Sequence, residues 1–320
     1  MKWNILVGFL VFLLTACDEK EGVTPLMFAA KSGNTIELAE LIAGGANVNE
    51  NSDYDWTALM FASSAGHEDA VILLIDAGAD VNLTSIEVPS AFSTVGGYGP
   101  TSALSEAITE GHLSIANILI DSGAAIDANS LALAGGQGSI PLLETMVALG
   151  GDLNKPSASG FHRTALNVAA FKGDIKAINW LLENGADPNL VLPNSTSLSR
   201  AVRGIQPEAV EFLIDHGADP NLTFGSAGYT VLYEAIYVYI NSYNYGRNLE
   251  VIKILLENGA DQYSLINNQQ QFMLEHVKKS LAGSYERSMD PKYNEEIKDR
   301  YRKSAEYEKA VIELLIAHSR

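Results

Sequence analysis

The chain of 320 residues is 47% hydrophobic and 19% charged, with a mean hydropathy of +0.06, a composition that excludes wholesale disorder. Its formal net charge is −18, and residues 18–262 carry 10 Lys/Arg against 30 Asp/Glu. So acidic a body repels phosphate backbones and argues against nucleic acid as a partner; the charge either steers in a basic protein partner or only keeps the chain in solution.

The N-terminus has the pattern of a secretory signal peptide. A positive second residue precedes an apolar run at residues 5–14, which is too short for a membrane-spanning helix of about 20 residues. The sequence Leu14-Thr15-Ala16-Cys17 resembles the lipobox of bacterial lipoproteins, and Cys17 is the only cysteine. The resemblance implies cleavage before Cys17, a lipid on its sulfur and a fatty acyl chain such as palmitate on the new amino group. The alternative is an ordinary signal peptide with a coincidental cysteine.

The residues after the cysteine predict where the protein is held. Asp18 resembles the signal that retains lipoproteins in the inner membrane of enteric-type bacteria. We therefore predict a lipid-anchored envelope protein that faces the periplasm from the inner membrane. Residues 1–16 would be removed, and residues 17–23 would be the lipidated cysteine and a short linker. Six extended residues reach about 20 Å, so the next domain must begin near the membrane surface.

Seven copies of one pattern follow within residues 24–262. Each copy begins with Thr, Ser or Asn, has Leu at position three and Ala at position six, and ends on a glycine. The starts are Thr24, Thr57, Ser102, Asn129, Thr164, Thr196 and Thr230, and the closing glycines are Gly45, Gly78, Gly123, Gly150, Gly185, Gly217 and Gly259. The starting residue can cap a helix, and most copies have a second glycine midway that ends the first helix in a left-handed turn. The pattern therefore predicts two helices in each copy.

The copies resemble the ankyrin repeat, whose pattern contains Thr-Pro-Leu-His, Ala-Ala, Gly, Leu-Leu and Gly-Ala-Asp-Val-Asn. The resemblance implies an all-α ankyrin-repeat solenoid, monomeric, that binds a protein partner and does not catalyse a reaction. No copy has the histidine of the family at position four, and Ile205 replaces the midway glycine of the sixth copy. The first helix of the fourth copy, near residues 131–138, is degenerate, and we expect local weakness there.

Residues 263–320 are predicted to be a helical C-terminal cap or a diverged eighth repeat. Residues 311–317 resemble the second helix of the seventh copy, and residues 271–281 would be the first helix. Between them, apolar and aromatic residues recur every four positions from Tyr293 to Ala305, which indicates a further helix. A terminal repeat needs a polar outer face, and this charged tail supplies one.

Two insertions distinguish the copies from one another, and we expect the partner-binding surface there. One lies within residues 83–100, contains Phe92 and Tyr98, and stands beside a short connection, which predicts a notch. The other lies inside the seventh copy and is rich in Tyr and Arg, the residue types that dominate interface hot spots. Its candidate contacts are Tyr237, Tyr239, Tyr243, Tyr245 and Arg247. The alternative is that these tyrosines pack on the charged tail.

Other residues give weaker indications of function. Tyr54 and Trp56 precede the second copy and are candidate partner contacts; the alternative is that Trp56 packs between repeats. The six histidines lack zinc-ligand spacing, no phosphate-binding loop is recognisable, and no residue is singled out as a nucleophile. We therefore predict no enzyme activity, no cofactor and no metal.

The predicted anchor and the predicted repeats together suggest a role in the envelope. Ankyrin-type lipoproteins resemble immunity proteins that neutralise delivered toxins, including phospholipase effectors of the type VI secretion system. We therefore predict partner binding at the membrane surface, with such a toxin as the partner. The alternative is a structural or stress-related envelope protein that supports a periplasmic enzyme and has no single tight partner.

Overall fold

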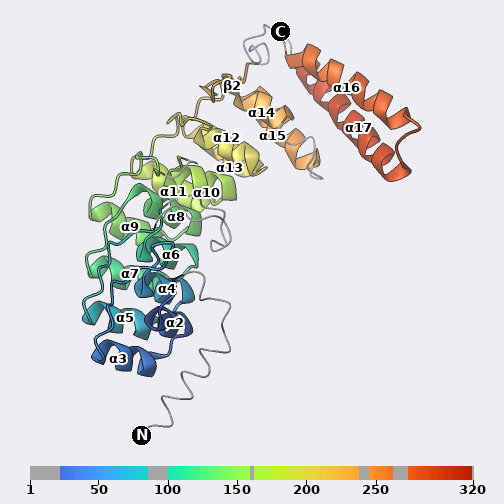
Figure 1. Cartoon of the computed structure of the whole chain (residues 1–320). Helices are drawn as coiled ribbons and strands as arrows, with labels where there is room; N and C mark the ends of the chain where they lie inside the picture. The colour runs from blue at the N-terminus through green and yellow to red at the C-terminus, as the bar shows by residue number, and fades with distance from the viewer. Residues whose placement is uncertain (1–21, 86–99, 159–161, 238–244, 262–272, 319–320) are drawn as a thin grey trace. The chain divides into compact units, whose positions relative to one another are not determined.

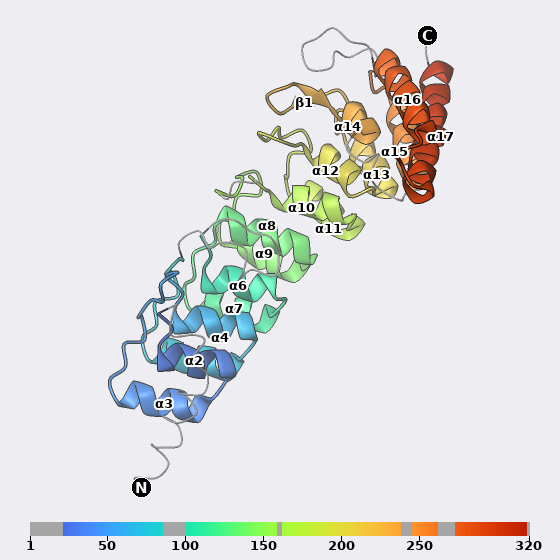
Figure 2. The same ribbon diagram turned by 45° about the vertical axis from the view of Figure 1, so that its right-hand side comes forward.

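The computed structural model describes residues 22–85, 100–158, 162–237, 245–261 and 273–318, which form pairs of antiparallel helices (Figures 1 and 2). The seven copies are repeats 1–7, and each contributes one pair. The pairs are α2 (Pro25–Ser32) with α3 (Thr35–Ala43), α4 (Ala58–Ala65) with α5 (Glu68–Asp76), α6 (Ala103–Thr109) with α7 (Leu113–Asp121), α8 (Ala128–Gln137) with α9 (Ile140–Ala148), α10 (Ala165–Lys172) with α11 (Ile175–Glu183), α12 (Ser197–Arg203) with α13 (Pro207–Asp215), and α14 (Val231–Tyr237) with α15 (Tyr245–Glu257). This is the predicted all-α ankyrin solenoid.

Capping residues fix where the first helices begin. The cap lies in extended backbone, and its side-chain oxygen accepts a hydrogen bond from the N–H three residues on, which satisfies an otherwise orphaned donor. This holds for Thr24, Thr57, Ser102, Thr164 and Thr196. In repeat 4 the predicted start is wrong: Asp127, and not Asn129, accepts from the Ser130 N–H at 2.7 Å. The carboxylate two residues earlier is the better-placed acceptor, so α8 begins at Ala128.

The alanine at position six explains how neighbouring repeats approach one another. A methyl group keeps the first helix thin on the side that meets the next first helix. All seven of these side chains are fully buried: Ala29, Ala62, Ala107, Ala134, Ala169, Ala201 and Ala235. The closing glycines have φ between +82° and +94°, the left-handed conformation that the sequence predicts for them.

The degenerate first helix of repeat 4 is an unbroken helix of 10 residues. Gly135 and Gly136, two glycines inside this helix, allow α10 to approach it closely. A Cβ atom added to Gly135 would lie 2.7 Å from Ala165 Cα, and one added to Gly136 would lie 2.7 Å from Val168 Cγ1. Helix α10 therefore packs directly against the backbone of α8.

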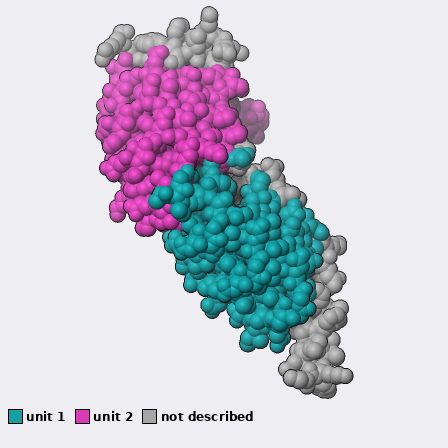
Figure 3. Space-filling view, turned by 90° about the vertical axis from the view of Figure 1, so that its left-hand side faces the viewer, with its two compact units in different colours: residues 1–133, 148–150, 158–161 teal, residues 134–147, 151–157, 162–320 magenta. Residues whose placement is uncertain are grey.

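The described chain divides into two compact units (Figure 3). Unit 1 comprises the described residues within 1–133, 148–150 and 158–161. Unit 2 comprises those within 134–147, 151–157 and 162–320. In unit 1, α2 packs on α4 and α4 on α6, while α3 packs on α5 and α5 on α7. In unit 2, α10, α12 and α14 pack in the same order, as do α11, α13 and α15. Each unit therefore has a face of first helices and a face of second helices.

In five of the repeats, an asparagine that follows the closing turn joins this turn to the closing turn of the next repeat. In repeat 5, the Asn189 side-chain amide donates to Gly217 O at 2.8 Å, and the Asp219 N–H donates to Asn189 Oδ1 at 2.8 Å. The same pair of bonds is made by Asn49, Asn82, Asn154 and Asn221. Asp127 stands where repeat 3 would have this asparagine, and it caps α8 instead.

Short extended segments lie between some repeats. Strands β1 (Thr223–Phe224) and β2 (Tyr229–Thr230) form an antiparallel hairpin before α14 that the sequence did not indicate. The ends of the first insertion are joined, because the Ser85 N–H donates to Thr101 O at 2.8 Å. Residues 86–99 lie outside the described residues, and so does the predicted notch.

The tail is a hairpin of two long helices, α16 (Met273–Met289) and α17 (Glu295–Ala317). The charged stretch is not a separate third helix, because it supplies the end of α16, the turn and the start of α17. Helix α17 packs on α15, and the Tyr307 hydroxyl accepts a bond from the Asn248 amide at 2.7 Å. At 17 and 23 residues, these helices are much longer than the helices of an ankyrin repeat.

Candidate partner-binding site

Several predicted site residues lie outside the described residues. These are Cys17, Phe92, Tyr98, Tyr239 and Tyr243. Of the remaining tyrosines in the second insertion, Tyr237 is the last residue of α14 and Tyr245 is the first of α15. The insertion therefore separates the two helices of repeat 7.

Trp56 is part of the protein interior. Its side chain is only 7% exposed, and its ring centroid lies 5.0 Å from that of Phe61. The Ser52 N–H donates to Trp56 O at 2.9 Å and closes the turn before α4. This position favours packing over partner contact for Trp56, whereas Tyr54 is half-buried beside it.

Arg247 joins two second helices. Its Nη2 atom lies 2.7 Å from Glu208 Oε2, so it links α15 to α13. Both side chains are well exposed to solvent. Exposed pairs of this kind contribute about 0.2–1 kcal/mol, so a partner with a carboxylate could displace Glu208 at little cost.

The structure brings together a group of residues that the sequence analysis missed. Phe171, at the end of α10, is 40% exposed, and the guanidinium carbon of Arg200 on α12 lies 4.6 Å from the centroid of its ring. Lys172 follows Phe171 and is also exposed. We call these three residues the Phe171–Arg200 surface. The sequence could have indicated this surface, because an aromatic residue and cations lie within the first helices of neighbouring repeats.

A buried ion pair supports the neighbouring helix. Arg203 on α12 pairs with Glu234 on α14, whose side chain is nearly inaccessible to solvent. Arg203 Nη2 also donates to Asn194 O at 2.9 Å, and its guanidinium lies 5.9 Å from the ring centroid of Phe224 in β1. Burial raises the pKa of Glu234 to about 7, although Arg203 and Arg200 act to lower it. Arg203 thus holds α12, α14 and the β-hairpin together.

Two tyrosines continue this side of repeat 7. The rings of Tyr229 and Tyr233 stack with centroids 4.8 Å apart and planes at 4°. Both are half-buried, and burial raises the pKa of the Tyr233 hydroxyl, with a smaller effect from Tyr229. Aromatic side chains held rigidly in this way lose little entropy when a partner binds.

Charge is segregated between the two faces of unit 2. Its repeat helices α10, α12 and α14 contain the cations Lys172, Arg200 and Arg203 against one carboxylate, the buried Glu234. The helices α11, α13 and α15 contain three cations against six carboxylates: Lys176, Arg247 and Lys253, against Glu183, Glu208, Glu211, Asp215, Glu250 and Glu257. The acidic net charge of the chain therefore conceals a first-helix face of the opposite sign.

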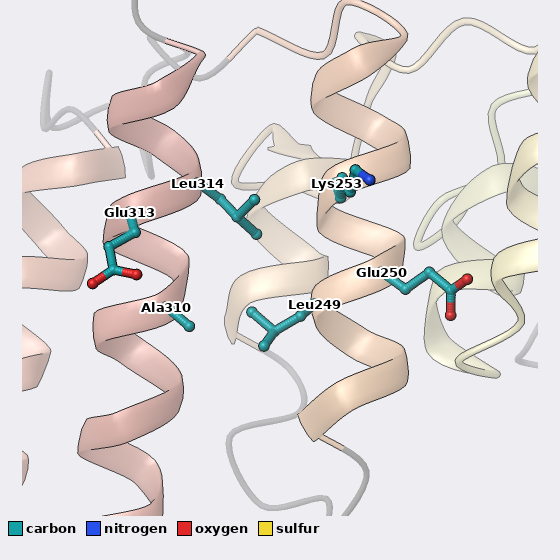
Figure 4. A pocket seen from close by; sticks show the side chains of 6 residues that line it. All are labelled: Leu249, Glu250, Lys253, Ala310, Glu313 and Leu314. Atoms are coloured by element: carbon teal, nitrogen blue, oxygen red, sulfur yellow. The ribbon is translucent and has the colours of Figure 1, made fainter.

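An open pocket of about 450 Å³ lies between α15 and α17 (Figure 4). Leu249 and Leu314 face each other across it, Ala310 lies beside them, and charged residues form its edge. Of the described residues that line it, none is Ser, Cys or His. An apolar groove with a charged edge has no nucleophile beside a base and therefore offers no recognisable catalytic centre.

Two features are lacking in the described part of the chain. Among those residues, no group of three or more His, Cys, Asp or Glu side chains is arranged to hold a metal ion. None of the helices there combines the length and the apolar character that a membrane crossing requires.

Stacked helix pairs, whose first helices in unit 2 carry more cations than carboxylates, define a helical-repeat scaffold. A family model described as ankyrin repeats (3 copies) matches residues 5–85, 130–224 and 166–266, more than half of the chain, and the chain therefore belongs to the ankyrin-repeat family. The crystal structure of the human ASB11 ankyrin repeat domain is similar, with a TM-score of 0.58 and 24% identity, over 75% of this chain and 99% of that one. A search of curated proteins found no match. Ankyrin repeats are typically non-catalytic scaffolds and imply a protein partner.

Proposed function

We propose that the chain is a lipid-anchored ankyrin-repeat protein of the bacterial cell envelope that faces the periplasm and binds a protein partner. The anchor is carried by one observation: Cys17, the only cysteine, follows an apolar run and Leu14-Thr15-Ala16. The binding role is supported by membership of the ankyrin-repeat family and by the aromatic and cationic side chains on the first helices of unit 2.

The proposed lipid explains why a cysteine is needed at this place. A thiolate is a far better nucleophile than a hydroxyl, so it can take the lipid on its sulfur. Several acyl chains together hold a protein on a membrane, where one chain gives only marginal binding. Asp18 supports retention in the inner membrane. The repeats would then begin within about 20 Å of the lipid surface.

We further propose that the partner is a toxin delivered to the periplasm, of the phospholipase class, and that this protein neutralises it. A tether of six residues would keep the repeats where a lipid-attacking enzyme must work. Binding alone is enough for neutralisation, because covering the active site of the toxin excludes its substrate. This role therefore requires no catalytic group in the ankyrin-repeat chain.

Fatty-acid labelling tests the anchor directly. In cells fed an alkyne-tagged palmitate, we expect the wild-type chain to be labelled and processed, and Cys17→Ser to be unlabelled and to keep residues 1–16. Asp18→Ser is the matched control: it should keep the label and move the protein to outer-membrane fractions. A labelled Cys17→Ser chain, or an unlabelled wild type, contradicts the anchor.

The toxin role is tested by genetics. We expect a gene beside this one to encode a toxin that kills cells when it is sent to the periplasm, and co-expression of this chain to restore growth. If the adjacent gene product is harmless, and deletion of this chain produces only a general envelope-stress phenotype, the structural alternative is supported instead.

A further inference from the structure

We propose that the Phe171–Arg200 surface binds an acidic segment of the protein partner, with a carboxylate on Arg200 and an apolar side chain against Phe171. This inference rests on the proposed partner-binding function and names the chemistry of its site. It runs against the expectation from net charge alone, which favours a basic partner.

The geometry of Arg200 suits a carboxylate. A guanidinium stacked on an aromatic ring is held flat, with its N–H groups spread in one plane, and a carboxylate matches that fork with two parallel hydrogen bonds. The guanidinium carbon of Arg200 lies over the Phe171 ring, 4.6 Å from its centroid, and this contact restrains the Arg200 side chain. Little side-chain entropy then remains to be lost on binding.

The surroundings make this surface selective for anions. Lys172 adds an exposed cation next to Phe171 and the half-buried Arg200, and its ammonium group donates one hydrogen bond to Gly136 O. The single carboxylate of these first helices, Glu234, is buried and paired with Arg203, so it does not repel an acidic ligand at the surface. On the second-helix face, α13 carries three carboxylates and no cation and repels an acidic ligand, which favours the first-helix face.

Phe171 supplies the apolar part of the contact. A ring that is 40% exposed leaves surface for an apolar side chain of the partner, and its position is fixed by the backbone behind it. A Cβ atom on Gly204 would collide with Phe171 O, so glycine is needed there for α10 and α12 to approach one another. The site therefore combines the partly exposed Phe171 ring with the positive charge of Arg200 above it.

Selection from a phage library of random 12-residue peptides on the full chain tests the inference without knowledge of the partner. We expect the selected peptides to be rich in Asp and Glu around an apolar or aromatic residue. Arg200→Gln should weaken the best peptide at least about tenfold, as loss of a charge-assisted bond predicts. Lys176→Gln removes the same charge from an exposed position on α11 and should change binding less than about twofold.

The outcomes separate this inference from the proposed function. Selected peptides without acidic residues, or acidic peptides that bind Arg200→Gln as well as wild type, overturn the inference. Phe171→Ala gives a second measure, because it should weaken the same peptides while leaving the helical circular-dichroism signal and the melting curve close to wild type. If a partner is found in the envelope but contacts another face, partner binding stands and the Phe171–Arg200 site is wrong.

Discussion

Ile205 occupies a backbone conformation that disfavours its own side chain. Its φ is +52°, at the mid-repeat turn where repeats 1–5 have glycine, and a β-branched residue is strained in this left-handed region. The preceding Gly204 cannot exchange places with it, because its missing Cβ is what lets Phe171 O approach. The sixth repeat therefore keeps a glycine for packing and accepts strain one residue later.

Replacing this isoleucine should stabilise the protein. Left-handed strain costs roughly 1–2 kcal/mol, and glycine loses about 0.5–1 kcal/mol more backbone entropy on folding. We therefore expect Ile205→Gly to raise the free energy of unfolding by up to about 1.5 kcal/mol. Urea unfolding measures it. Gly204→Ala is the control and should lower stability. A destabilised Ile205→Gly chain would show that contacts of the isoleucine outweigh its strain.

The buried Glu234 makes stability depend on pH. The pKa of Glu234 is about 7 in the folded chain and near 4.5 in the unfolded chain, where the side chain is not buried. The proton therefore binds the folded chain more tightly. The resulting stability is fully present below about pH 4.5 and is lost as pH rises through 7. Relative to wild type, we therefore expect Glu234→Gln to gain stability from pH 5 to pH 8, by on the order of 3 kcal/mol at most.

Unfolding of both chains in urea at the two pH values checks this prediction. Glu106 and Glu308 also have a pKa raised chiefly by burial, but both remain in the variant, so the difference between the two chains isolates Glu234. An unchanged difference at pH 5 and pH 8 would mean that the Arg203 pair keeps Glu234 ionised throughout.

At the scale of elements, the repeats were predictable and their junctions were not. Leu and Ala recur in fixed positions because each repeat packs on a copy of itself, so local sequence carries the pattern. The sequence predicts the cap of α8 at Asn129, whereas Asp127 caps this helix. Asp127 stands at the position where other repeats have the asparagine that bonds to the next closing turn, so its role as a cap could not be predicted. The β1–β2 hairpin was missed because two-residue strands have no periodicity to detect.

Tyr307 joins the C-terminal hairpin to repeat 7 by polar contacts beside buried apolar residues. The Tyr307 hydroxyl accepts from Asn248 at 2.7 Å and donates toward Ala235 O at 3.4 Å, while Val311 and Leu315 are fully buried below it. We expect Tyr307→Phe to cost about 1–2 kcal/mol, because the Asn248 amide loses a partner in the interior. Amide hydrogen exchange in α16 and α17 should speed up accordingly.

Tyr285 provides the matched control for this junction. It lies on α16 and is 51% exposed, so Tyr285→Phe should change stability by less than about 0.5 kcal/mol. Equal exchange rates in the two variants would mean that the apolar residues alone hold the hairpin on α15.

At the scale of the whole molecule, the sequence predicted the ankyrin-repeat family, whereas it did not indicate the Phe171–Arg200 surface. Net charge adds both faces together, so the cations on α12 were invisible in the total of −18. Insertions attracted attention because they differ between repeats, whereas Phe171 and Arg200 stand at ordinary helical positions. Only the stacking of α10 beside α12 places those two side chains together.

Site-specific photo-cross-linking in living cells tests the central claim most directly, namely that this ankyrin-repeat protein binds a protein partner through the first-helix face of unit 2. A benzophenone side chain in place of Phe171 should yield one discrete adduct with another protein, identifiable by mass spectrometry. The same side chain in place of Glu211, exposed on α13, should yield none. An adduct from position 211 and none from position 171, or no adduct from either, would contradict the account.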